Sequence, residues 1–155
     1  MQLGRRTKGA VNAAVFAFRL FVGGLLIAAG GLKIGHSAAL AASIASFRLL
    51  PPGVIAPLAL GLPFLEVMLG VYLVAGLFTR IAAAVAALQF LTYAAAVAWA
   101  TVRHIPAGCG CFGPNDTAVA DWPHVAFDLA LALASAFIAF GAPGALAVDR
   151  RFRSS

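Results

Sequence analysis

Long runs of apolar residues, separated by short polar breaks, dominate this chain. Each run is about as long as the 17–25 residues that a helix needs to cross a bilayer core of about 30 Å. The runs lack the alternating pattern of barrel strands, and an unpaired backbone is too costly in hydrocarbon for any open structure. We therefore predict an all-α fold, an integral membrane four-helix bundle. Its transmembrane helices are expected over residues 11–32, 54–78, 81–102 and 122–146.

The stretch between the first two apolar runs, residues 33–53, is too short and too broken to span a membrane. Ser37 is suited to cap a short helix there. In such a helix Leu40, Ile44 and Phe47 share one face, while polar residues fall largely elsewhere. We predict a short amphipathic helix that lies in the membrane interface, in contact with lipid.

Composition also indicates a membrane protein. Of the 155 residues, 63% are hydrophobic and only 10% are charged, whereas soluble domains have about 25% charged residues. The length fits one domain, residues 1–155. A net charge of +6 is compatible with nucleic-acid binding, but the basic residues gather at chain ends and loop junctions instead of along one face. We expect no nucleic-acid partner.

The distribution of Lys and Arg predicts an orientation. With an even number of spans, both termini share one side with the connection at Arg80. That side collects seven basic residues: Arg5, Arg6, Lys8, Arg80, Arg150, Arg151 and Arg153. The opposite side collects three: Lys33, Arg48 and Arg103. Because cytoplasmic loops carry the excess, we predict a multi-pass protein of the cell inner membrane with both termini in the cytoplasm.

The first apolar run, with basic residues before it, also has features of a secretory signal. Its length exceeds that of a signal core, and Arg19 interrupts it. We therefore expect it to be retained as a membrane anchor.

Both cysteines of the chain, Cys109 and Cys111, lie in one loop on the side opposite the termini. Thiols at this spacing can bridge only if the backbone folds their Cα atoms to within about 7 Å, which Gly110 permits by tolerating a positive φ. So short a loop gives a structural disulfide little entropic benefit. A strained, exposed disulfide is instead the kind that exchanges readily, and disulfides persist outside the cytoplasm.

Two other interpretations of Cys109 and Cys111 remain open. The thiolates could hold copper(I) or zinc with His104 and His124, since soft ligands suit both ions. They could also be loop cysteines with no chemical role. Their spacing differs from the two-residue spacing of thioredoxin motifs and zinc knuckles, so neither of those families is indicated.

Ionisable residues inside the apolar runs are the second group of candidates. At 1.5 Å per residue, Arg19 lies about 16 Å from the cytoplasmic end of the bundle, counted from Lys8, and Glu66 lies about 21 Å from the same end, counted from Arg80. We predict that these two form a buried pair. Such a pair can simply fix helix register, or it can mark a proton or quinone site, because intramembrane charges are usually functional.

The last two helices add further polar residues. Gln89 and Tyr93 are expected in the interior of the bundle. Asp121 is placed to cap the last helix, with a proline in its first turn. Asp128, one to two turns further on, could face Lys33, Arg103 or the thiols, or could be a satisfied structural aspartate.

Several of these segments together resemble the family of the methylamine utilisation protein MauE, within the wider DoxX-like group. The segments are Arg19, Ala29-Gly30-Gly31-Leu32-Lys33, Phe47-Arg48-Leu49-Leu50-Pro51, Leu62-Pro63-Phe64-Leu65-Glu66 and Cys109-Gly110-Cys111-Phe112-Gly113. The cysteine pentapeptide combined with the proline-glutamate helix is the specific part of the match.

This resemblance implies a small membrane protein of thiol and disulfide handling outside the cytoplasm, with a periplasmic thioredoxin-like partner. The family is linked to maturation of a disulfide-rich dehydrogenase subunit, and DoxX-like proteins to quinone-dependent oxidation. The first hypothesis is thus a thiol-disulfide oxidoreductase component in which Cys109 and Cys111 exchange with the partner, and a quinone near Arg19 and Glu66, or a second protein, resets the pair. The alternative is a non-catalytic membrane scaffold or metal-handling subunit.

Overall fold

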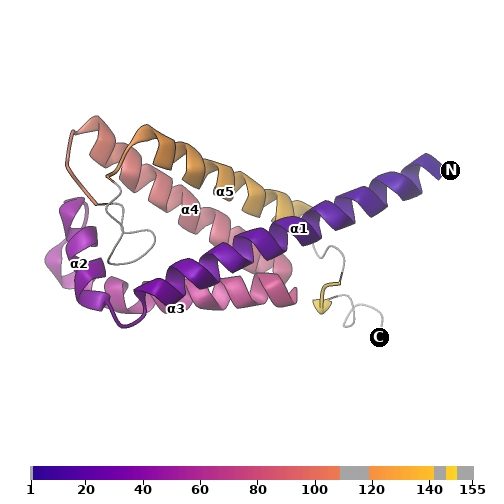
Figure 1. Cartoon of the computed structure of the whole chain (residues 1–155), viewed down its shortest axis with the longest axis horizontal. Helices are drawn as coiled ribbons and strands as arrows, with labels where there is room; N and C mark the ends of the chain where they lie inside the picture. The colour runs from indigo at the N-terminus through magenta and orange to yellow at the C-terminus, as the bar shows by residue number, and fades with distance from the viewer. Residues whose placement is uncertain (1, 109–118, 142–145, 150–155) are drawn as a thin grey trace.

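The computed structural model describes residues 2–108, 119–141 and 146–149. In these ranges the chain forms five helices, and four of them are long and apolar enough to cross a membrane. The helices are α1 (Gln2–Lys33), α2 (Ser37–Ser46), α3 (Pro52–Ala75), α4 (Thr79–Val102) and α5 (Trp122–Gly141). The predicted all-α membrane bundle, with a short helix between its first two spans, is confirmed (Figure 1).

The second span ends earlier than predicted, because the backbone conformation at its end outweighs hydropathy. The second span was expected to reach residue 78, but α3 ends at Ala75 because Gly76 adopts a left-handed conformation, with φ 71°. The N–H groups of Gly76 and Leu77 then bond to Tyr72 O, at 2.9 and 3.0 Å, which closes the helix. α5 is described as far as Gly141, and residues 142–145, over which the last span was expected to continue, lie outside the described residues.

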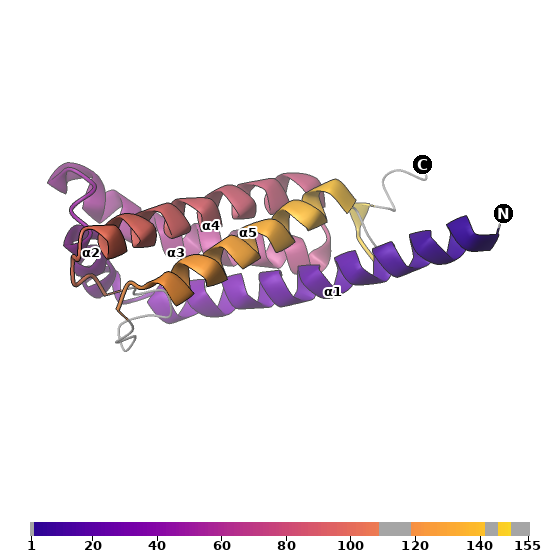
Figure 2. The ribbon, with the colours of Figure 1, turned by 90° about the horizontal axis from the view of Figure 1, so that it is seen from above.

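The four long helices pack as two close pairs, α1 with α3 and α4 with α5, and α1 also contacts α5 (Figure 2). The N-terminal part of α1 projects beyond the other helices, while α2 lies at the opposite end of the bundle (Figures 1 and 2). The core between the pairs contains Val22, Leu26, Leu73, Phe90 and Ile138.

Glycines bring α1 and α3 into close contact. A Cβ added to Gly23 would lie 2.8 Å from Gly70 O, and one added to Gly30 would lie 2.6 Å from Pro63 O. Gly24 faces open space instead. Gly23 and Gly30 therefore form the surface of α1 that meets α3, and this contact fixes the antiparallel register of the two helices.

The N-cap of the short helix α2 lies one residue earlier than expected. His36, not Ser37, occupies the N-cap position, and no side chain bonds to the first turn. The His36 carbonyl accepts the Leu40 N–H at 3.1 Å. Leu40 and Phe47 are buried, as the amphipathic pattern predicts.

At the start of α5 the expected cap is present. Asp121 Oδ1 accepts the main-chain N–H of His124 at 3.0 Å, which satisfies a donor of the first helical turn. The His124 ring also bonds to this carboxylate, and these bonds hold the pKa of Asp121 below its ordinary value. This capped turn places the chain so that α5 returns along α4.

Candidate functional site

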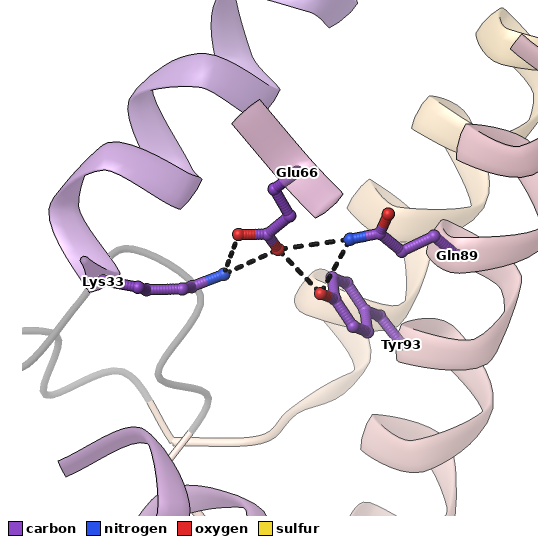
Figure 3. Close-up of polar contacts among 4 residues, drawn as sticks. All are labelled: Lys33, Glu66, Gln89 and Tyr93. Carbon is purple, nitrogen blue, oxygen red and sulfur yellow. Dashed lines mark hydrogen bonds and ion pairs between the residues drawn. The ribbon is translucent and has the colours of Figure 1, made fainter. Parts of the chain in front are cut away.

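A buried polar cluster joins α1, α3 and α4 (Figure 3). It includes Lys33, the last residue of α1 before the short helix α2. Glu66 of α3 is 1% exposed, Lys33 of α1 is 4% exposed and Gln89 of α4 is 7% exposed. Lys33 Nζ lies 2.8 Å from Glu66 Oε1 and 2.9 Å from Oε2. The carboxylate thus meets the ammonium group through both of its oxygens.

Two side chains of α4 complete the shell of the carboxylate. The Tyr93 hydroxyl donates to Glu66 Oε1 at 2.6 Å, and Gln89 Nε2 approaches the same oxygen at 3.3 Å. Gln89 Nε2 also donates to the Tyr93 hydroxyl at 2.9 Å. Because Tyr93 and Gln89 are four residues apart on one helix, their side chains lie side by side and face α3.

The predicted pair of Arg19 and Glu66 is wrong. Arg19 is fully buried, but its Nε donates to Leu73 O at 2.8 Å and its Nη2 to Val74 O at 3.2 Å. Glu66 lies seven residues before Leu73 on α3, or about 10 Å away along the helix. Arg19 therefore binds carbonyl groups of the last turn of α3, and Lys33 is the partner of Glu66.

The register of α1 and α3 explains why Lys33, and not Arg19, pairs with Glu66. Gly23 meets Gly70 and Gly30 meets Pro63, so Glu66 lies opposite the turn that precedes Lys33. Helical side chains lean toward the helix N-terminus, which aims the Lys33 side chain back at Glu66. The sequence contains a signal for this, because Arg19, Gly23, Leu26, Gly30 and Lys33 follow a 4-3-4-3 spacing and share one face of α1.

A cavity of about 460 Å³ opens beside the cluster, among α2, α3 and α4. Lys33, Thr92 and Tyr93 supply polar groups to its wall, and Ser43 lies at its α2 side. The rest of the lining is apolar: Leu40, Ile44, Phe47, Leu49, Leu50, Leu58, Leu62, Ala95, Ala96, Val97 and Trp99. Cavities of this size and character are typical of sites for small apolar ligands with one polar group.

Cys109 and Cys111 lie outside the described residues, but the residues on either side of their loop contact each other. Gly108 and Val119 form an antiparallel bridge, and Ala120 N–H donates to Ala107 O at 3.0 Å. Ser43 of α2 donates to Gly108 O at 2.9 Å. The cysteine segment therefore leaves and rejoins the bundle at one place, next to a helix that lines the cavity.

The described residues add no further ligand to the metal site considered above. His124 bonds to Asp121 and His104 follows α4 at a positive φ of 52°. Within the ranges that the structure covers, no three His, Cys, Asp or Glu side chains gather in a way that would hold a metal ion. A metal site that includes the cysteines stays a prediction.

The fold and cluster define a multi-pass helical membrane protein with a buried ion pair beside an apolar cavity. The family model of the methylamine utilisation protein MauE matches residues 11–141. A methylamine utilization protein MauE from Paracoccus denitrificans is 32% identical over 133 residues, which cover 85% of this chain and 72% of the relative. The chain therefore belongs to the MauE family. No solved structure matches it.

Proposed function

We propose that this protein is the membrane component of a thiol-disulfide exchange system that serves methylamine utilisation. Cys109 and Cys111 exchange with a thioredoxin-like partner outside the cytoplasm and pass electrons to an acceptor in the membrane. Membership of the MauE family supports the pathway. The hydrogen bond from Ser43, in the cavity wall, to Gly108, next in sequence to Cys109, supports the electron route.

The electron balance of this proposal has two steps. The partner's dithiol is oxidised to a disulfide while the disulfide of Cys109 and Cys111 is reduced to two thiols. A lipid-soluble quinone then takes two electrons and two protons from these thiols and becomes a quinol, and the disulfide forms again. The thiolate is the reactive form of cysteine in each exchange.

The cavity beside Lys33 and Tyr93 is the candidate quinone site. Its apolar lining suits a lipid-soluble ring and tail, and the ammonium and hydroxyl groups suit a ring carbonyl. Glu66 belongs to this site through its bonds to both residues. Arg19, which binds the end of α3, takes no part in it.

The test is a non-reducing gel of cells that carry Cys109→Ser, Cys111→Ser or both. If the pair exchanges disulfides, one single variant accumulates a mixed disulfide with the partner, because the second thiol is no longer there to resolve it. The adduct disappears on reduction and is absent from the double variant. In the native protein, a membrane-impermeant maleimide labels the reduced cysteines of intact cells if the termini are cytoplasmic.

Other outcomes separate the alternatives. Stoichiometric copper or zinc that is lost on Cys109→Ser supports the metal-handling subunit. Full complementation by the double variant removes the cysteines from the mechanism. Maleimide labelling only after permeabilisation overturns the orientation.

A further inference from the structure

A second and smaller cavity, of about 30 Å³, lies among α1, α4 and α5. Lys33 and Tyr93 line it, as they line the large cavity, and α5 contributes Asp128 and His124. The other lining residues are apolar. The proposed disulfide exchange gives Asp128 no role, so its presence among these residues needs a separate explanation.

Asp128 carries an unsatisfied oxygen in this place. Its side chain is 5% exposed, and Oδ2 has no hydrogen-bond partner in the part of the chain that the structure describes. A buried carboxyl oxygen without a partner is costly, above all within a membrane span. The cavity exceeds the roughly 10–15 Å³ that one water molecule requires, so a water fits beside this oxygen.

Lys33 supplies the second partner that such a water needs. An ammonium group has three N–H donors, and Lys33 directs Nζ at the two oxygens of Glu66. One donor remains for the small cavity that Lys33 lines. A water there accepts from Lys33 and donates to Oδ2 of an ionised Asp128, or accepts from this oxygen when Asp128 is protonated, so that both groups have a partner. The ammonium group in the same wall disfavours a metal cation.

We propose that the small cavity is a water site and that Asp128 passes protons through it between the loop end of the bundle and Glu66. His124 begins the route, because its side chain is 30% exposed and it lies one helical turn before Asp128. The other ionisable groups around the site are Lys33 of α1, Tyr93 of α4 and, behind Lys33, Glu66 of α3.

The transfer is balanced by a shift along the hydrogen-bond chain. Lys33 gives a proton to Glu66 and becomes a neutral amine, this amine takes a proton from the water, and the water takes the proton of Asp128. The charge of Lys33 and the water are unchanged at the end, and one proton has moved from Asp128 to Glu66. His124 then returns a proton from solvent to Asp128. The route does not involve the cysteines, so it stands or falls separately from disulfide exchange.

The test is infrared difference spectroscopy of the purified full chain in lipid nanodiscs, native and with Asp128→Asn. Ser135→Ala is the matched control, since Ser135 is also buried on α5 and, among the described residues, bonds only within its helix, to Leu131 O at 2.8 Å. The native protein and the control should show a water O–H band that shifts in ¹⁸O-labelled water. Asp128→Asn should lose this band.

The proton route is measured by the deuterium exchange of the Tyr93 hydroxyl after transfer to D₂O, with Tyr93→Phe to assign the signal. In Asp128→Asn the exchange should slow on the order of a hundredfold, the scale of a positioned proton-transfer group. Equal exchange rates in the native protein and Asp128→Asn overturn the route. Absence of the isotope-sensitive water band in the native protein overturns the water site, and this measurement decides even if Asp128→Asn does not fold.

Discussion

The helix α1 buries a cation at each of two levels, and the two have different surroundings. Arg19 donates to carbonyl groups at the last turn of α3, where the orphan carbonyls of a helix end need donors. Lys33 instead meets the carboxylate of Glu66, with two cavities beside it. The first arrangement ends a helix, whereas the second holds an ion pair and a hydroxyl next to space for a ligand. Buried charge alone therefore does not distinguish a structural residue from a candidate functional one.

The largest loss of stability is expected when the Glu66 carboxylate is removed. Glu66→Gln leaves the Lys33 ammonium buried without a counter-charge, and breaking such a pair costs about 3–5 kcal/mol. The free energy of unfolding, measured by denaturant titration in detergent, should fall by this amount.

A double variant, Lys33→Met with Glu66→Leu, separates stability from function. Apolar groups of similar volume often replace a buried pair at no cost in stability. The double variant should therefore recover most of the unfolding free energy but not the proposed disulfide exchange. Recovery of both would show that the pair only fixes the helix register. If a change at Arg19 recovered the stability lost in Glu66→Gln, this would support a pair of Arg19 with Glu66 and contradict the pairing in the structure.

A smaller effect is expected at the other cation. Arg19→Met removes hydrogen bonds from a charged donor to Leu73 O and Val74 O, and such bonds contribute about 1.5–3 kcal/mol. The unfolding free energy should fall within that range, while the activity of the protein that remains folded should match the native value. A selective loss of activity at native stability would assign Arg19 a functional role and remove the contrast with Lys33.

The smallest effect concerns Asp149, which lies near Arg19 at the same end of the bundle. Its carboxylate accepts the N–H groups of Phe78 and Thr79, each at 2.8 Å, and so caps α4. Partial burial raises the pKa of Asp149, but the bond from Thr79, that from Phe78 and the attraction of Arg19 outweigh it and leave the pKa below its ordinary value.

A carboxyl with a lowered pKa stabilises the fold above its unfolded pKa, about 3.9 for Asp. That contribution is lost as the pH falls through the folded value. Asp149→Asn should therefore cost about 0.5–2 kcal/mol near neutral pH, as for other helix caps, and should reduce the loss of stability in acid. Thermal unfolding at several pH values measures this, and an unchanged acid dependence would contradict it.

The sequence alone determined the class of fold. Four apolar runs in a chain with 10% charged residues leave no soluble alternative, since only helices satisfy their backbone locally in lipid. It also determined the Asp121 cap at the start of α5, which depends on neighbours a few residues apart. These features are local, so the sequence contains all that decides them.

Only the tertiary structure decided which charges meet. The depth estimates for Arg19 and Glu66 were each counted from a helix end, and errors in those ends, together with an unknown axial offset between α1 and α3, exceeded the length of a side chain. The contacts of Gly23 with Gly70 and of Gly30 with Pro63 set that offset. The axial position of one helix against another is a sum over many small packing contacts, so the pairing of Lys33 with Glu66, and the cavities beside it, emerge only once the helices are packed.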